Sequence, residues 1–172
     1  MLTTDDPETG DAAPPRIRDM HPEPREEVRV ASFHDLDTTT LYAILKLRCD
    51  VFVVEQNCPY NDLDGRDLEP GTRHVWLSRD DEILAYLRIL DDGGTERIGR
   101  VVTARPARGA GHAQRLLAEA LTVIGNRPSV LHAQAYLVGF YERFGFRPTG
   151  PEYLEDGIPH VPMAKAAPQP AR

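Results

Sequence analysis

The chain has 172 residues, 41% of them apolar, which suits one domain with a real core plus a tail. Its net charge is −7, and residues 1–27 contribute −5 of this through eight acidic residues and three arginines. No basic cluster marks a nucleic-acid-binding surface, no apolar run nears the ~20 residues of a membrane span, and no secretory signal opens the chain. We therefore expect a soluble cytoplasmic protein that binds neither nucleic acid nor membrane.

The two ends of the chain differ in composition from its middle. Residues 1–27 are rich in proline and charge, so they cannot bury enough surface to offset the entropy of ordering, and we expect a disordered tail. Residues 28–166 form the domain, and residues 167–172 a short C-terminal tail.

Cys49 and Cys58 are too few for a disulfide framework, and we expect free thiols, with Cys49 a small core residue on a helix.

The first half of the domain alternates strands and a helix. Residues 28–32 predict a strand, and residues 38–52 a helix with threonines able to cap its start. Its apolar residues recur at the helical period, with Leu45, Cys49 and Phe52 expected to dock the helix; they are Leu41, Ile44, Leu45, Cys49 and Phe52. A loop covers residues 57–67. Residues 73–78 and 83–90 predict a β-hairpin, followed by a strand at residues 97–103.

The second half continues this alternation. Residues 111–125 carry a helical apolar stripe, and residues 130–135 predict a buried strand. Residues 137–145 predict a short helix that stops at Gly145. Residues 158–164 predict a last strand, whose two prolines favour a sheet edge. The order of elements predicts a layered α/β domain around a central sheet.

The most informative chemistry lies where the strand at residues 97–103 leads into the next helix. Gly109 and Gly111 let the backbone approach a ligand closely, and the free amides of a helix start suit a pyrophosphate. Arg105 and Arg108 can add charge-assisted contacts. A Walker loop would need Gly-Lys-Ser/Thr, and a dinucleotide fingerprint a small residue at Gln114, so both alternatives fail.

These residues resemble a known family. "RGAGHA" (108–113) is similar to the Gln/Arg-x-x-Gly-x-Gly/Ala motif of the GCN5-related N-acetyltransferases (GNAT), and "AYLVGFYERFGF" resembles the second signature of that family. "LRCDVFVVEQNCPYNDLDGRD" and "YLEDGIPHVPM" resemble its ElaA-like subfamily more closely. The resemblance runs from Leu41 to Met163.

The resemblance implies the GNAT acyltransferase fold, an α/β fold with a mixed, mostly antiparallel central sheet, splayed parallel central strands and flanking helices. It implies acetyl-CoA as acyl donor and a primary amine, of a small molecule or a peptide, as acceptor. We expect no metal, because no cluster of residues has the ligand spacing typical of zinc. The implied coenzyme A contacts are Arg100, Val101, Val102, Thr103, Arg108, Gly109, Ala110, Gly111, His112, Ala113, Gln134, Phe140 and Tyr141. The side chain of His112 itself is expected to point outward.

The implied chemistry is direct attack of a neutral amine on the thioester. Tyr141 occupies the general-acid position of the family and can protonate the departing thiolate; the alternative is packing beside Phe140 and Phe144. An alkyl amine has a pKa near ~10.4, so it must first lose a proton. The candidate bases are His74, His160 and Glu55, while His132, in an apolar strand, is interpreted as a core residue.

Two acidic loops are expected near the acceptor. We hypothesise that they attract a cationic amine; the alternative is an ordinary solvated surface. The acids concerned are Asp62, Asp64, Asp67 and Glu69 in the first loop and Glu152, Glu155 and Asp156 in the second. The first loop fails as an EF-hand because the ligand positions do not fit, so its aspartates are read as capping the "DLDG" turn, and Arg48 as pairing with a nearby acid.

Three further hypotheses stay open. The chain could transfer another acyl group, it could be a non-catalytic module that binds acyl-CoA, and it could form a homodimer. Its first helix also resembles that of acyl-homoserine lactone synthases, although their other motifs are absent. Cys58 is expected to be structural, with the cleft as its alternative location.

Overall fold

A computed structural model describes residues 25–167. The predicted tails lie outside this range, except that Glu26 and Glu27 already belong to the first strand and residue 167 closes the described part. Within this range no helix has the length and apolar character needed to cross a membrane.

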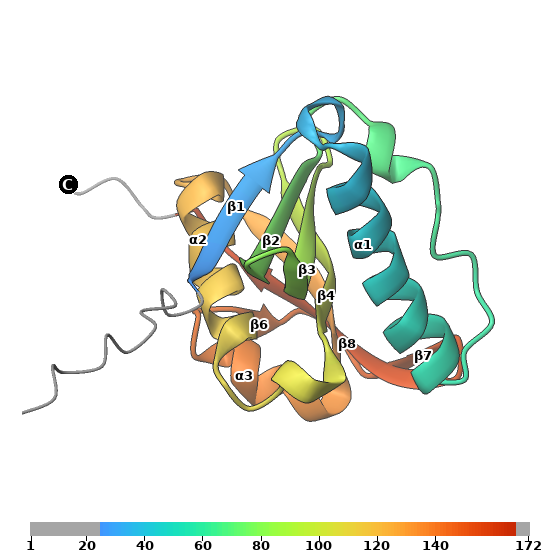
Figure 1. The fold of residues 1–172 in the computed structure, drawn as a ribbon. Helices are drawn as coiled ribbons and strands as arrows, with labels where there is room; N and C mark the ends of the chain where they lie inside the picture. The colour runs from blue at the N-terminus through green and yellow to red at the C-terminus, as the bar shows by residue number, and fades with distance from the viewer. Residues whose placement is uncertain (1–24, 168–172) are drawn as a thin grey trace, which may run out of the picture.

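One eight-stranded sheet organises the domain (Figure 1). Its order is β1-β2-β3-β4-β5-β8-β6, and β7 also pairs with β8. Every pairing is antiparallel except β4 with β5, which are parallel neighbours at the centre. This mixed, mostly antiparallel sheet confirms the predicted fold class. The strands are β1 (Glu26–Ala31), β2 (Arg73–Arg79), β3 (Glu82–Asp91), β4 (Glu96–Thr103), β5 (Ser129–Gln134), β6 (Arg147–Pro148), β7 (Tyr153–Glu155) and β8 (Ile158–Lys165).

The helices cover both faces of the sheet. The α-helices are α1 (Thr38–Arg48), α2 (His112–Ile124) and α3 (Val138–Glu142); α1 continues as a π-helical segment, Cys49–Glu55. Short 3₁₀ turns occupy Phe33–Asp35, Arg66–Leu68, Arg105–Ala107 and Ala135–Leu137. Asp37, rather than a threonine, caps α1 by accepting a hydrogen bond from the Thr40 amide at 2.9 Å. Gly145 follows α3 with φ +89°, as its predicted role as a stop requires.

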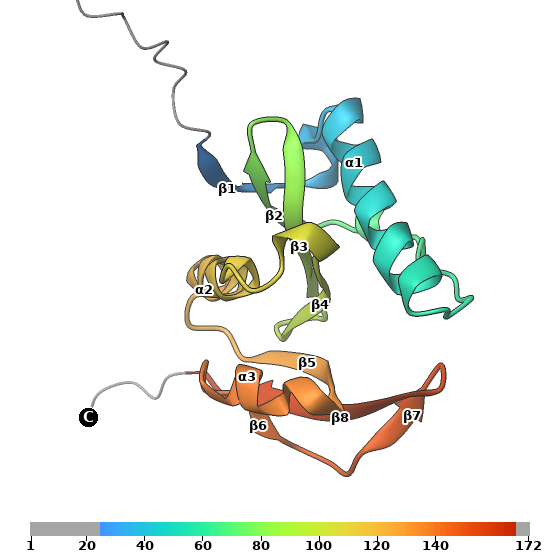
Figure 2. The same ribbon diagram turned by 60° about the horizontal axis from the view of Figure 1, so that its bottom comes forward.

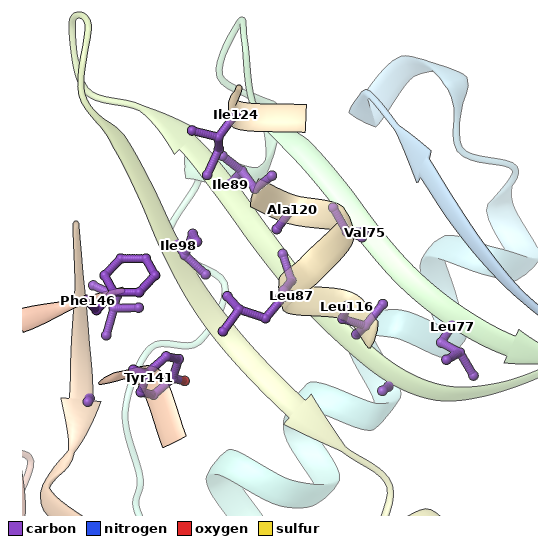
Figure 3. Packing of buried hydrophobic residues seen from close by; sticks show 14 of the residues in the cluster. Val75, Leu77, Leu87, Ile89, Ile98, Leu116, Ala120, Ile124, Tyr141 and Phe146 are labelled. Carbon is purple, nitrogen blue, oxygen red and sulfur yellow. The ribbon is translucent and has the colours of Figure 1, made fainter. Parts of the chain in front are cut away.

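The main core lies between α2 and the sheet (Figure 3). Leu116, Ala120 and Ile124 of α2 pack on Leu87 and Ile89 of β3, all within 3% of complete burial. The stripe predicted from the helical period is thus the core face of α2.

A second core lies under α1, and the predicted face was right only in part. Ile44 is buried as predicted, but Leu45, Cys49 and Phe52 are only half-buried, and Leu47 and Val51 take their place in the core with Trp76, Tyr86 and Val102. Arg48 is completely buried and belongs to this inward stripe.

The predicted edge position of β8 was also wrong. β8 lies between β5 on one side and the short strands β6 and β7 on the other. Each of its prolines has a strand partner on one side only: Pro159 pairs with β7 but lies beyond the part of β8 that pairs with β5, and Pro162 pairs with β5 but falls in the gap between β6 and β7. The Pro162 carbonyl accepts a hydrogen bond from the Thr149 amide at 2.8 Å in that gap.

The parallel pair β4–β5 separates almost at once. The two strands pair only through Glu96 with Ser129 and Arg97 with Val130. At this junction the completely buried Glu96 forms ion pairs with Arg73 and Arg127. Figure 2 shows β5 and β8, with α3 beside them, diverging from β4 beyond the junction. The splayed central strands predicted for the fold are therefore present.

Candidate active site

A cavity of about 660 Å³ lies where β4 and β5 separate. Its walls come from β4, β5, α3, the π-helical segment after α1 and the β7–β8 hairpin. It brings together most of the residues predicted for the site: Arg100, Val101, Val102, Thr103, Arg108, Ala113, Gln134, Phe140, Tyr141, Glu55 and His160.

The β4 wall carries a β-bulge. Leu87 of β3 stands opposite both Arg100 and Val101, and Arg100 has φ +54°, which is rare for a residue with a side chain. Beyond Arg97, β4 has no strand partner on its β5 side. Backbone groups along this side of β4 are therefore available to a ligand in the cavity.

A buried network of arginines and aspartates holds the loop after α1. Arg48 contacts Asp62 at 2.9 Å and Asp67 at 2.8 Å, and Arg88 contacts Asp64 at 2.7 Å. Arg100 adds ion pairs to Asp62 at 2.7 Å and Asp64 at 3.4 Å. The predicted pairing of Arg48 with a nearby acid is confirmed.

This network changes the expectation that the first acidic loop attracts a cationic acceptor. Asp62, Asp64 and Asp67 are neutralised by arginines from α1, β3 and β4, and Glu69 pairs with Arg66 at 3.0 Å. Burial opposes the ionisation of Asp67, but the contacts to Arg48 and Arg88 outweigh it and hold its pKa below the ordinary value. The capping role is present as well, because Asp64 Oδ1 accepts from the Arg66 amide at 3.0 Å.

The predicted anion loop forms one end of the site. Gly109 and Gly111 have φ of +81° and +80°, and with Thr103, Arg108 and His112 they line a second hollow that shares residues with the main cavity. Their left-handed backbone explains why glycine stands at both positions. Ala110 and Arg105 line neither hollow.

Glu55 lies at this end and is paired with Arg108. Its two carboxylate oxygens accept from Arg108 at 2.7 and 3.1 Å, and Arg108 also donates to the Thr103 carbonyl at 3.2 Å. The hydrogen bond from Arg108 lowers the pKa of Glu55. This pairing makes Glu55 a poor base, although the sequence had made it one of three candidate bases.

His112 does not point outward as predicted. Its ring is buried, with Nδ1 3.0 Å from the Ala107 carbonyl and Nε2 3.2 Å from a carboxylate oxygen of Glu26. It therefore fastens the anion loop to β1 through a residue that had been assigned to the tail.

Tyr141 packs among aromatic rings and also reaches the cavity. Its side chain is 5% exposed, with ring centroids 5.0 Å from Phe140 and 6.2 Å from Phe146, and it also lines the cavity. Burial raises the pKa of its hydroxyl, so the group keeps its proton near neutral pH.

The histidines are placed differently from their predictions. His74 is buried outside the cavity, with Nδ1 2.7 Å from the Tyr86 hydroxyl and Nε2 3.2 Å from the Asp67 carbonyl, so it is not brought to the cavity with the other candidate bases. Burial also lowers its pKa. His160 lines the cavity, and its Nδ1 lies 2.8 Å from the Ile158 carbonyl.

His132 is the residue that sequence reasoning missed. It was interpreted as a core residue, but its side chain is 43% exposed and lines the cavity. The signal was present in the strand, because Leu131 and Ala133 are buried while His132 and Gln134 alternate with them.

Both cysteines are free, and Cys58 is the one that faces the cavity. Cys58 is buried, whereas Cys49 is half-buried rather than a core residue. Among residues 25–167, no three His, Cys, Asp or Glu side chains are grouped so as to hold a metal ion.

Comparison with known proteins agrees with this geometry. Residues 46–167 match the family described as "Acetyltransferase (GNAT) domain". The chain belongs to the GNAT acetyltransferase family.

Its relatives place it in the ElaA-like group of this GNAT family. It is 51% identical over 145 residues to a UPF0039 protein of Mycobacterium tuberculosis, covering 81% of this chain and 93% of that one. It is 46% identical over 138 residues to the protein ElaA of Escherichia coli, covering 76% and 90%. A solved structure described as an acyl-CoA N-acyltransferase from Pseudomonas aeruginosa superimposes with a TM-score of 0.79 at 43% identity, covering 83% of this chain and 100% of that one. The GNAT fold implies that the cavity binds an acyl-CoA.

Proposed function

We propose that this GNAT protein transfers the acetyl group of acetyl-CoA to a primary amine. The observation that carries the proposal is the convergence of three features on the main cavity and the hollow that adjoins it. These are the unpaired side of β4, the glycine-containing start of α2, and the Tyr141 hydroxyl. A thioester donor needs all three: a surface for its amide-rich arm, an anion site for its pyrophosphate, and a proton for its leaving thiolate.

In this proposal each part has a role. The amides of Gly109 to Ala113, joined by Arg108, hold the pyrophosphate. The β4 backbone from Arg100 to Thr103 faces the pantetheine arm and the acetyl carbonyl, Gln134 and Phe140 line the opposite wall, and an amide near the bulge stabilises the oxyanion. Tyr141 protonates the thiolate as the carbon–sulfur bond breaks.

The acceptor in this proposal is a cationic primary amine. With the first loop neutralised, the carboxylates left at the cavity are those of Glu155 and Asp156, whereas Glu152 does not line it. These two acids favour an ammonium group over an anionic acceptor.

An amine screen tests the proposal. Purified protein is mixed with acetyl-CoA and a panel of cationic, neutral and anionic amines, and product is measured by mass spectrometry. We expect turnover with cationic amines, and Tyr141→Phe to lower kcat by about 100-fold with an unchanged dissociation constant for acetyl-CoA. The matched control is Tyr42→Phe, which alters an exposed tyrosine on α1 and should keep full activity. Turnover restricted to anionic amines would refute the cationic acceptor.

A second candidate function is an acyl-CoA-binding module without transfer. The observation that favours it is the burial of Tyr141, since burial raises its pKa and weakens it as an acid. Tight binding of acetyl-CoA by calorimetry, together with no product from any amine, would favour this alternative. Repeating the screen with longer acyl-CoA donors tests transfer of another acyl group.

A further inference from the structure

Four side chains form a hydrogen-bonded chain at the acceptor end of the cavity, and all but Glu155 have no part in the roles proposed above. They are Arg97 of β4, His132 of β5, and Tyr153 and Glu155 of β7. His132 Nδ1 lies 2.6 Å from the Tyr153 hydroxyl, which donates to Glu155 Oε2 at 3.0 Å. Arg97 Nη1 lies 3.5 Å from His132 Nε2.

The hydrogen bonds fix the protonation state of His132. A carboxylate can only accept, so the one proton of the Tyr153 hydroxyl goes to Glu155, and its oxygen accepts from His132 Nδ1–H. Arg97 can only donate, so His132 Nε2 carries a lone pair. Burial and the hydrogen bond to Glu155 raise the pKa of Tyr153 to about 12, which keeps its proton in place. The result is a neutral, oriented imidazole on the cavity wall.

We propose that His132 is the general base that deprotonates the acceptor ammonium, with Tyr153 and Glu155 as positioning residues. This inference rests on the proposed transfer to an amine. It is favoured over the other candidates because His74 lies outside the cavity and Glu55 is paired with Arg108. His160 is oriented by the Ile158 carbonyl, but its side chain is 13% exposed against 43% for His132.

The proposed acetyl transfer conserves protons and electron pairs. The ammonium replaces Arg97 in its long 3.5 Å contact with His132 Nε2 and gives one proton to that nitrogen, and the freed lone pair forms the carbon–nitrogen bond while the carbonyl electron pair moves to oxygen. Collapse of this intermediate breaks the carbon–sulfur bond, and the thiolate takes the Tyr141 proton. The second proton of the attacking nitrogen restores Tyr141, and solvent removes the proton from His132. The products are the acetylated amine and free coenzyme A.

The charged groups facing His132 give a specific test. They are Arg97, Glu155 and His160, and Tyr153 is the other titratable group in contact. Burial lowers the pKa of His132, Glu155 opposes this, and Arg97 and His160 add to it. Hence Glu155→Gln should lower the pKa of the imidazole further, and Arg97→Gln should raise it.

The experiment measures kcat/KM against pH for the amine chosen by the screen. In the wild type we expect activity to fall on the acidic side with a midpoint below 6.5, the ordinary pKa of histidine. This midpoint should move to lower pH in Glu155→Gln and to higher pH in Arg97→Gln. Tyr153→Phe should lower kcat while keeping an acidic limb, and His132→Gln should lower kcat by about 100-fold or more and remove this limb. The matched control, His34→Gln, changes an exposed histidine outside the cavity and should leave the profile unchanged.

The outcomes separate the inference from the function on which it rests. Opposite shifts in the two charge variants support His132 as the base, because a merely structural histidine would not move a kinetic midpoint. Wild-type turnover with a limb that survives in His132→Gln, or does not move in the charge variants, would overturn the inference and leave the transferase function standing. Absence of turnover with every amine would overturn both.

Discussion

Replacing Arg48 with methionine tests whether the buried ion network stabilises the fold. The Arg48 side chain is completely buried and donates to Asp62 Oδ2 at 2.9 Å, to the Asp62 carbonyl at 2.8 Å and to Asp67 Oδ1 at 2.8 Å. Removing one partner of a buried ion pair costs about 3–5 kcal/mol because the other charge is left without compensation. Asp62 keeps Arg100 and Asp67 keeps Arg88, so we expect the lower end, about 3 kcal/mol.

Urea denaturation measures this loss, with the fluorescence of Trp76 as reporter. Trp76 is the only tryptophan, and it is buried in the cluster under α1. With a slope of about 1–3 kcal/mol per molar urea, a loss of 3 kcal/mol lowers the midpoint by about 1–3 M. The matched control is Lys46→Met, two residues before Arg48 on α1. It removes an exposed ion pair between Lys46 and Asp50 and should cost at most about 0.5 kcal/mol.

The pH dependence provides a sharper check. The folded pKa of Asp67 is held below its ordinary value, so the stability it contributes is present above that value and is lost as the pH falls through the folded one. In Arg48→Met the ionised Asp67 has lost one arginine partner, so its contribution to stability is already smaller at neutral pH than in the wild type. The difference between variant and wild type should therefore be largest near pH 7 and should narrow below about pH 4. A cost equal to that of Lys46→Met, or one that stays constant down to pH 3, would refute the reasoning.

Two further predictions concern the coenzyme end of the site. Glu55→Gln frees Arg108 from its carboxylate partner. Because an exposed ion pair is worth at most about 1 kcal/mol, we expect acetyl-CoA to bind up to about fivefold more tightly, as measured by calorimetry. Weaker binding would contradict this prediction. Gly111→Ala forces a side chain into φ +80° and places its Cβ 3.3 Å from Gln114 Oε1, so we expect a loss of about 1–2 kcal/mol in thermal unfolding and weaker coenzyme binding. A melting temperature and affinity equal to the wild type would show that the left-handed conformation is not required.

Most of the fold was predictable because local patterns and tertiary packing agree. The stripe of α2 and the stop at Gly145 were read from helical period and backbone preference, which act within a few residues. β6 and β7 were missed because strands of two and three residues carry no measurable period. Without them the prolines of β8 indicated an edge, and its interior position could not be deduced.

The site was predictable where backbone conformation decides it. Gly109 and Gly111 indicate a close backbone approach from the sequence alone, because glycine is tolerant of the left-handed region. The role of His132 depends on the separation of β4 from β5, which leaves one face of β5 open instead of covered. The alternation of Leu131 and Ala133 with His132 and Gln134 marks one face of β5 as polar, but it does not show that this face borders a cavity.

The aspartates of the acidic loop explain how that loop and the reaction centre are connected. Their partners Arg48, Arg88 and Arg100 come from three elements at sequence separations of 14 to 38 residues, so charge counting alone predicted a field where the fold forms a neutral network. Arg100 is both a member of this network and the residue with φ +54° at the β4 bulge. Such a conformation persists only where surrounding contacts hold it. The ion pairs of the loop therefore contact the residue whose backbone lies at the proposed oxyanion site, and these aspartates already have arginine partners before an acceptor binds.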